Sequence, residues 1–266
     1  MAEYASRGLR LHYEEIGTGR PLVLLHGITN FGLSWAQQLG LLTSLGWRVV
    51  LPDVAGHGRS APVIAPTTPQ ELAADVIALL DQLHLDRAVV GGLSLGGMVA
   101  QQIALHHPAR VRSLVLGGTH SGGRRAAFPE SEVVAFFRRR AVMPSEEAAW
   151  ASVPYNYGPR GRAEQADRIA EDIERRLHNP FNERAYRAQL LAASLHNCYR
   201  RLDRIRAPTL VVHGARDRII PVANAHMTAE RVPGAQLEIL DEAGHLYPTE
   251  EPAVDEAIGR FFAAHA

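Results

Sequence analysis

The sequence predicts an α/β fold, in which a mostly parallel sheet carries helices on both faces and one helical cap is inserted. Short apolar runs alternate with helical patterns along most of the chain, which is the rhythm of βαβ units. The 266 residues are enough to bury the core of one such domain together with an inserted subdomain. The rhythm stops in one central stretch and resumes at the sequence APTLVVHGARD.

Seven apolar runs are the candidate strands of this sheet. They are residues 9–14, 22–25, 48–52, 88–91, 113–116, 209–212 and Gln236–Leu240. Because helical patterns separate most of them, we expect parallel pairing with helices crossing both faces.

The clearest predicted helix spans residues 68–83. Its apolar side chains recur at helical spacing and form one stripe, which consists of Leu72, Val76, Leu79, Leu80 and Leu83. Thr68 can cap the helix, Pro69 fits its first turn, and Glu71 completes a Thr-x-x-Glu capping box. A second helix is expected to start after Ser94 and to stop near His107, before a proline.

The central stretch, residues 121–204, contains only helical patterns punctuated by proline and glycine. We interpret it as a helical cap over a site below, inserted between core segments at residues 1–120 and 205–266. The alternative is that these helices only add packing. The arginine pair at 124–125 and the arginine triplet at 138–140 are expected on solvated faces of this insertion.

The composition excludes several classes of function. The formal net charge is zero, so nothing points to a nucleic acid or an anionic membrane as partner, and no apolar run approaches the 20 or so residues that span a bilayer. The first residues contain no apolar segment of a secretory signal, so a cytoplasmic location is expected. Cys198 is the single cysteine, which excludes an internal disulfide and a multi-cysteine metal site.

All 28 basic residues are arginine. The absence of lysine excludes Schiff-base chemistry, a Walker-type phosphate loop and a Ser–Lys dyad. No metal site and no cofactor are expected.

The sequence VVGGLSLGG places Ser94 where a strand gives way to a helix. A serine hydroxyl is a poor nucleophile until a base accepts its proton, and a sharp strand–turn–helix elbow forces the side chain out of the sheet. Gly92 and Gly96 match the Gly-x-Ser-x-Gly pattern, in which small neighbours relieve crowding at the elbow. Ser94 is therefore the predicted nucleophile.

An acid and a base follow Ser94 in the order that such a site requires. Asp217 comes just after the strand at residues 209–212, and His245 comes after the strand at Gln236–Leu240. We predict that His245 is the general base and that Asp217 orients it. The loop after the strand at 22–25 should present the backbone N–H of Ile28 toward the serine, and together with the N–H of Leu95 it forms the predicted oxyanion hole.

The remaining histidines near these motifs are expected to support the structure. His26 should brace its loop, His57 should organise the turn around it, and His213 should be a satisfied core residue at the end of a strand.

Five segments together resemble the α/β-hydrolase superfamily: LLHGIT, LPDVAGHGRS, VVGGLSLGGMVAQQIALHHPARVRSLVL, PTLVVHGARDRIIP and AGHLYPTEEP. The likeness covers essentially the whole chain outside the cap. It implies an α/β-hydrolase fold and a Ser94–Asp217–His245 triad without a cofactor. By analogy with the family, the wall of the substrate pocket is expected to include Phe31, Trp35, Met98 and Leu246.

The resemblance implies a small-molecule ester or lactone as substrate, because the sequence looks most similar to carboxylesterases and to 3-oxoadipate enol-lactonase-like members. Family members with aspartate or cysteine as nucleophile are disfavoured by the serine. An enol-lactonase, a carbon–carbon bond hydrolase and a cofactor-free perhydrolase stay open as alternatives, although Leu93 and Leu246 stand where carbon–carbon hydrolases usually have asparagine and tryptophan. The alternative from another class is a small-ligand receptor that retains the triad.

Overall fold

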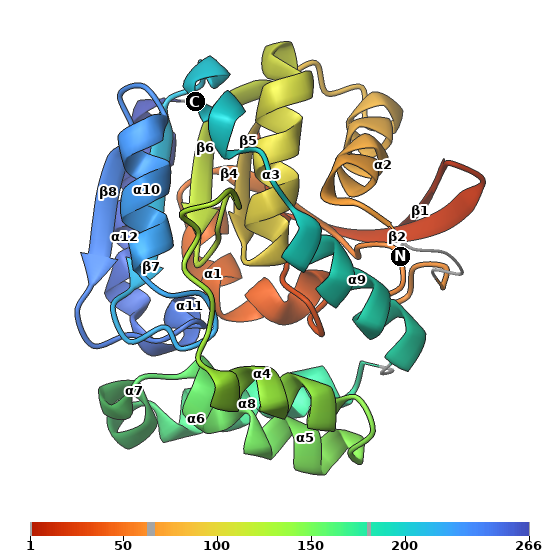
Figure 1. The fold of residues 1–266 in the computed structure, drawn as a ribbon. Coiled ribbons are helices and arrows are strands. Elements are labelled where there is room, and N and C mark those ends of the chain that lie inside the picture. Colours follow the sequence, from red (N-terminus) through yellow and green to blue (C-terminus); the bar gives the residue numbers. More distant parts are fainter. Residues whose placement is uncertain (1, 63–66, 180–181, 266) are drawn as a thin grey trace.

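The computed structural model describes residues 2–62, 67–179 and 182–265 and contains one eight-stranded sheet (Figure 1). The order of its strands is β1-β2-β4-β3-β5-β6-β7-β8. The strands are β1 Ala2–Ser6, β2 Leu9–Ile16, β3 Arg20–Leu25, β4 Trp47–Pro52, β5 Ala88–Leu93, β6 Val111–Gly117, β7 Thr209–Gly214 and β8 Gln236–Leu240.

The sheet is parallel from β4 to β8, and β1 and β2 extend it in antiparallel fashion. All seven predicted strands are present, so the predicted mostly parallel sheet is confirmed. β1 was not predicted because it has only five residues, and among them only Tyr4 and Ser6 are buried. A turn at Arg7 and Gly8, both with positive φ, connects β1 to β2.

Helices cover both faces of the sheet, as predicted (Figure 1). The helices of the core segments are α1 Ala36–Ser44, α2 Pro69–Gln82, α3 Leu95–His106, α10 Ala223–Arg231, α11 Tyr247–Glu250 and α12 Pro252–Ala264, with 3-10 turns at Gly32–Trp35, Pro108–Arg110 and Tyr199–Arg204. No helix in the described parts of the chain has the length and apolar character needed to cross a bilayer.

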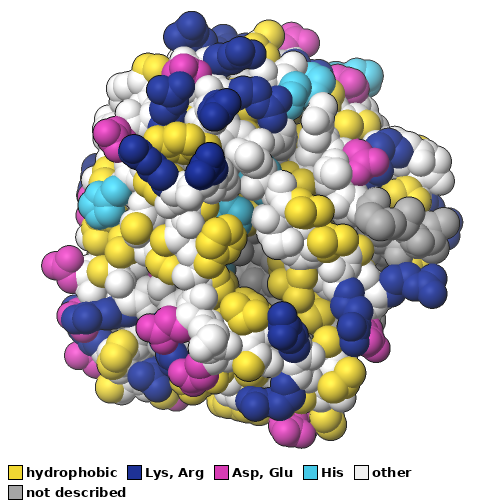
Figure 2. Space-filling model, viewed as in Figure 1, with side chains coloured by type: hydrophobic (Ala, Val, Ile, Leu, Met, Phe, Trp, Pro, Cys, Tyr) yellow, Lys and Arg dark blue, Asp and Glu magenta, His cyan; other side chains and the backbone are white. Residues whose placement is uncertain are grey.

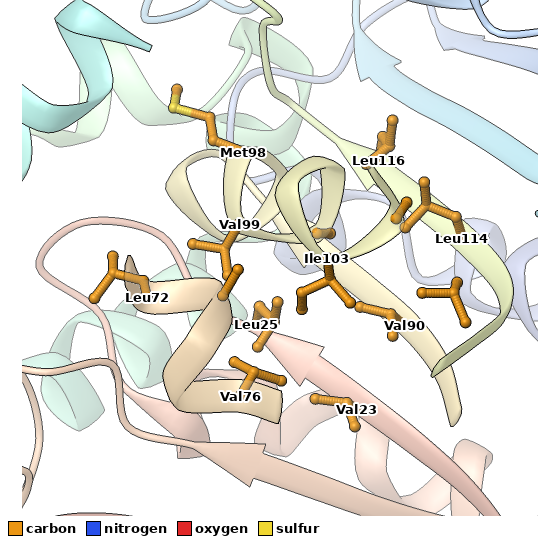
Figure 3. Packing of buried hydrophobic residues seen from close by; sticks show 14 of the residues in the cluster. Val23, Leu25, Leu72, Val76, Val90, Met98, Val99, Ile103, Leu114 and Leu116 are labelled. Carbon is orange, nitrogen blue, oxygen red and sulfur yellow. The ribbon is translucent and has the colours of Figure 1, made fainter. Parts of the chain in front are cut away.

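The strands divide their side chains between two hydrophobic clusters, because successive residues of a strand point to opposite faces. Along β3, Val23 and Leu25 belong to the cluster under α2 and α3, whereas Leu22 and Leu24 belong to the cluster under α1 and α12. Figure 3 shows the first cluster, in which Val76 of α2 and Val99 and Ile103 of α3 point toward side chains of β3 and β5. The sheet thus lies between helical layers, with a hydrophobic cluster on each face.

Among the described residues, six α-helices lie between β6 and β7 in the sequence. They are α4 Ser131–Arg140, α5 Ser145–Ala151, α6 Val153–Asn156, α7 Pro159–Glu164, α8 Ala166–Leu177 and α9 Glu183–Leu195. In Figure 1, α4 to α8 form a layer below the sheet, and α9 leads the chain back toward α3. This is the stretch in which the sequence predicts helices alone.

The predicted capping box at the start of α2 is present. Thr68 Oγ1 accepts a hydrogen bond from Glu71 N at 3.2 Å, and Thr68 N donates to Glu71 Oε2 at 2.8 Å. These contacts satisfy N–H groups that a helix start otherwise leaves without partners. The stripe from Leu72 to Leu80 is buried against the sheet as expected.

We predict that Thr68→Ala lowers the free energy of unfolding by about 1 kcal/mol, because it removes the acceptor for Glu71 N. Urea unfolding followed by circular dichroism measures the change. Thr18→Ala, at an exposed threonine in the turn before β3, is the matched control and should have little effect. Equal losses in both variants would contradict a specific capping contribution.

Candidate active site

Ser94 occupies the sharp turn between β5 and α3. Its backbone has φ 57° and ψ −119°, a conformation that a residue other than glycine rarely adopts. Neighbouring strands stabilise this strained turn, since Ser94 N donates to Gly117 O at 2.9 Å and Thr119 Oγ1 donates to Ser94 O at 2.8 Å. The turn directs the side chain to the end of the parallel strands, where loops of this kind of sheet form sites.

The two glycines of the predicted elbow are required by space. A Cβ added to Gly92 would lie 2.2 Å from Gly96 O, and one added to Gly96 would lie 2.2 Å from Leu25 O. Because the crowding atoms belong to the backbone, no side-chain movement could relieve these contacts. The Gly-x-Ser-x-Gly pattern therefore allows α3 to start directly against β3 and β5.

Asp217 follows β7 and is buried among hydrogen-bond donors. Its Oδ1 accepts from the N–H groups of Ile219 and Ile220, both at 2.8 Å, and its Oδ2 lies 2.7 Å from His245 Nδ1. Burial by itself would raise the pKa of Asp217, but the charge of His245 and the hydrogen bonds from His213 and His245 outweigh it and hold the pKa well below its usual range. Asp217 is therefore a carboxylate that only accepts hydrogen bonds.

His245 lies in the loop after β8. Because Asp217 accepts from Nδ1, the proton of the neutral imidazole resides on Nδ1, and Nε2 keeps its lone pair. The loop is held by Glu250, which accepts from Gly244 N at 2.8 Å and from Gly158 N at 2.7 Å. Burial raises the pKa of Glu250 to about 7 despite these two hydrogen bonds. Glu250 thus connects the loop that carries His245 to the helices inserted between β6 and β7.

His213 is a further contact of Asp217, although the sequence predicts only a core residue at this position. Its Nε2 lies 2.8 Å from Ile220 O and 3.2 Å from Asp217 Oδ2, and its Nδ1 is buried without a hydrogen-bond partner. The expectation of a satisfied core histidine is therefore corrected. Nothing in the sequence indicates this contact, because it depends on the turn that follows β7.

The loop after β3 passes directly beside Ser94. A Cβ added to Gly27 would lie 3.7 Å from Ser94 Oγ, and Ile28 follows Gly27 in the chain. Two buried histidines hold this loop to the loop after β4: Val54 N donates to His26 Nε2 at 2.9 Å, and Thr29 N donates to His57 Nε2 at 3.0 Å. The two loops that contain the sequences LLHGIT and DVAGHG are thus held together by hydrogen bonds.

Both bracing histidines accept hydrogen bonds and are neutral. Burial lowers the pKa of His26, although the charge of Asp53 opposes this shift. Burial, assisted by the charges of His26 and Arg140, lowers the pKa of His57 to about 3. A protonated ring could not accept from the backbone, so these low pKa values preserve the loop geometry.

Ser94 and His245 line one cavity of about 550 Å³. Figure 2 shows a hollow on the face of the molecule that is also seen in Figure 1. Hydrophobic side chains form most of its border, and basic side chains lie nearby. Ile28, Met98 and Leu246 also line the cavity. The side chain of Leu95 is fully buried in the core, and its backbone N–H belongs to the first turn of α3, whose N–H groups have no partner within the helix.

The structure corrects the expectation for Phe31 and Trp35, which do not line this cavity. Phe31 precedes the 3-10 turn Gly32–Trp35, and this turn carries Trp35 into the hydrophobic cluster under α1 and α12. Trp35 borders a smaller cavity of about 20 Å³. The change of direction in the turn could not be read from the sequence.

A second correction concerns the arginine triplet at the end of α4. Arg138 and Arg139 are exposed as expected, but Arg140 is only partly exposed and lines the cavity of Ser94. The helix turns its third arginine inward, toward α9 and α8. Among the described residues, no group of three or more His, Cys, Asp or Glu side chains is arranged to hold a metal ion.

Comparison with known proteins places this geometry in context. A family model described as the alpha/beta hydrolase fold matches residues 20–252. The chain is 28% identical to 3-oxoadipate enol-lactonase 2 of Acinetobacter baylyi, over 96% of both chains. It is 30% identical to a 2-hydroxy-6-oxononadienedioate/2-hydroxy-6-oxononatrienedioate hydrolase of Burkholderia vietnamiensis, over 89% of this chain and 85% of the relative.

A solved structure supports the same assignment of the fold. The enol-lactonase of Burkholderia xenovorans superposes with a TM-score of 0.87 at 25% identity, over 98% of this chain and 100% of that one. These findings confirm the fold that the sequence motifs predict.

We predict that Gly96→Ala lowers the free energy of unfolding by about 3 kcal/mol, because its Cβ would overlap Leu25 O. Gly40→Ala is the matched control, since a Cβ there meets no atom within 4 Å and alanine favours the interior of α1. It should raise the free energy by about 0.5–1 kcal/mol. Urea unfolding measures both changes. If the Gly96 variant were as stable as the parent, the elbow would have space for a Cβ at this position.

The low pKa of His57 predicts a pH dependence of stability. An unfolded histidine titrates near pH 6.5, whereas His57 in the fold has a pKa of about 3. Between these values the unfolded chain binds more protons, so the free energy of unfolding falls as the pH is lowered.

The variant His57→Gln keeps an acceptor for Thr29 N but removes the imidazole, which is the group that binds a proton in this pH range. We expect it to reduce the slope of unfolding free energy against pH by about 1.4 kcal/mol per unit between pH 5.5 and 4.5. Urea unfolding at several pH values tests this. If the unfolding free energies of parent and variant changed with pH by the same amount, the low pKa of His57 would be contradicted.

Proposed function

The chain belongs to the α/β hydrolase fold family, and from that premise we propose that it is a serine hydrolase of carboxylic esters or lactones. In this proposal Ser94 is the nucleophile, His245 the general base and Asp217 the residue that orients His245. The observation that carries it is that His245, whose Nδ1 donates to Asp217, lines the same cavity as Ser94 at its strained elbow. A strained serine and an oriented imidazole facing one cavity are the parts that acyl transfer needs.

In the first half of the reaction, His245 Nε2 accepts the proton of Ser94 Oγ while Oγ attacks the carbonyl carbon of the substrate. The carbonyl oxygen becomes an oxyanion, which the N–H groups of Ile28 and Leu95 stabilise. The imidazolium then gives its proton to the leaving oxygen as the C–O bond breaks. An acyl-enzyme and an alcohol result, or, for a lactone, an acyl-enzyme that still carries the hydroxyl.

In the second half, water attacks the acyl-enzyme. His245 accepts a proton from the water and returns it to Ser94 Oγ as the acid leaves. Asp217 stays ionised throughout, consistent with the depressed pKa of its carboxyl group, and stabilises the imidazolium that forms in each half.

The names of the relatives favour lactones as well as open esters. The relatives of Acinetobacter baylyi and Burkholderia xenovorans are named as enol-lactonases, and the opening of a lactone breaks the same kind of C–O bond as ester hydrolysis. The relative whose name describes a 2-hydroxy-6-oxo acid hydrolase keeps carbon–carbon cleavage as the alternative chemistry. Leu93 and Leu246 both line the cavity, and they disfavour that alternative because carbon–carbon hydrolases usually have asparagine and tryptophan at these positions.

We further propose that residues 121–204 form the cap of this site. Side chains of α4, α8 and α9 line the cavity of Ser94, so these helices define its outer wall. Glu250 and Asn156 hold the cap to the His245 loop, since Leu246 N donates to Asn156 O at 2.9 Å. The cap would thereby set which substrates reach Ser94.

We predict that Ser94→Ala reduces the hydrolysis of p-nitrophenyl butyrate by roughly 10,000-fold or more, because no other group can form the acyl-enzyme. Release of p-nitrophenol measures the rate, and urea unfolding confirms that the variant is folded. Ser44→Ala, at an exposed serine in the last turn of α1, should keep the parent rate. Undiminished turnover by the Ser94 variant would refute the proposed nucleophile.

A further inference from the structure

The cavity of Ser94 has an unbalanced set of charges. Among its described lining residues, four are arginines and none is aspartate or glutamate; the arginines are Arg138, Arg140, Arg176 and Arg187. Carboxylates outside the lining pair with two of them. Arg176 lies 3.1 Å from Asp172, and Arg187 lies 2.8 Å from Glu183.

The two other arginines differ in their access to water. Arg138 is exposed, so its charge is solvated. Arg140 is only partly exposed, its Nε is fully buried without a hydrogen-bond partner, and no carboxylate in the described chain lies within ion-pair distance of it. Its guanidinium lies 5.9 Å from the ring centre of Tyr186.

Arg140 carries its charge at neutral pH. Burial and the charge of Arg176 lower the pKa of Arg140, but only to about 10. Its place as the last residue of α4 also favours a cation, through the helix dipole. A charged guanidinium whose inner N–H has no acceptor is costly to bury, so an anion that enters the cavity would gain from binding it.

A second buried donor faces the same region. His57 Nε2 accepts from Thr29 N, so the proton of the neutral ring is on Nδ1, and this Nδ1 is buried without an acceptor. His57 and Arg140 line one small cavity of about 40 Å³. Thr29, Arg140 and Arg176 line both this cavity and the cavity of Ser94, so the two adjoin.

We propose that the substrate carries a carboxylate remote from the bond that is cleaved, and that Arg140 binds this carboxylate with the Nδ1–H of His57 beside it. This inference rests on the proposed ester or lactone hydrolysis and specifies its substrate class. The planar guanidinium fork matches a carboxylate. The apolar side chains that make up most of the remaining wall, including Val134, Phe137 and Leu190, suit an aliphatic segment between the carboxylate and the reacting carbonyl.

The test compares charged and neutral esters of the same shape. The parent enzyme is assayed with the p-nitrophenyl half-esters of adipic and suberic acids, which keep one free carboxylate. It is also assayed with their methyl-capped forms, in which that carboxylate is a methyl ester. Release of p-nitrophenol is measured, and the uncatalysed rates are subtracted. We expect a higher kcat/KM for at least one half-ester than for its methyl-capped form. Equal or lower values for both half-esters would overturn the proposal.

Variants assign the preference to Arg140. Arg140→Gln should lower kcat/KM for the preferred half-ester by roughly 10- to 100-fold, the size of one charge-assisted contact, and leave the methyl-capped ester within about threefold. Arg140→Lys should recover part of the loss. Arg139→Gln, at the exposed neighbour, is the matched control and should keep the parent preference. An equal loss on charged and neutral esters in Arg140→Gln would contradict carboxylate recognition.

A binding measurement separates this inference from the proposed hydrolysis. Calorimetric titration of the parent and of Arg140→Gln with adipate and suberate needs no turnover. If the parent hydrolyses neither ester yet binds a dicarboxylate that Arg140→Gln does not, the carboxylate site stands and the hydrolytic function fails. If the esters are hydrolysed but neither dicarboxylate binds and no half-ester is preferred, the function stands and the carboxylate site fails.

Discussion

The hydrogen bond between His245 Nδ1 and Asp217 Oδ2 decides which nitrogen of the imidazole keeps a lone pair, and the rest of the site is arranged around that outcome. Asp217 can serve as an acceptor in the interior only because two backbone N–H groups and two histidines compensate its charge. Burial and compensation act in opposite directions on its pKa, and compensation is the larger effect. The proposed chemistry depends on this balance, because a protonated Asp217 would no longer stabilise an imidazolium.

Hydrogen bonds to buried acceptors also hold the loops around Ser94. Their backbone N–H groups donate to buried ring nitrogens or carboxylates instead of water: Thr29 to His57, Val54 to His26, and Gly244 and Gly158 to Glu250. Burial lowers the pKa of His26 and of His57, so both rings are neutral and can accept these hydrogen bonds. Such loops keep the proposed oxyanion donors in place before a substrate arrives, which is the form of stabilisation that costs least during a reaction.

The helices between β6 and β7 contribute what the sheet cannot. The end of the sheet supplies the proposed reacting groups, whereas α4, α8 and α9 supply most of the wall opposite them and all four arginines of the cavity. Three of these arginines pair with a carboxylate or are exposed to solvent, whereas Arg140 has no carboxylate partner among the described residues and is only partly exposed. The inserted helices therefore define both the volume and the charge of the space, and in our proposals they define the substrate.

The sequence by itself determined the parts of this protein that depend on local chemistry. The Gly-x-Ser-x-Gly elbow, the order of Ser94, Asp217 and His245, and the capping box of α2 are properties of neighbouring residues, and each could be read directly. Only the tertiary structure decided that Arg140 turns inward while Arg138 and Arg139 stay in water, and that Trp35 packs under the sheet instead of lining the cavity. It also revealed His213 and Glu250 as contacts of the site. These features depend on where distant elements meet, because a side chain's burial and its partners are set by packing across the fold and not by its neighbours in the chain.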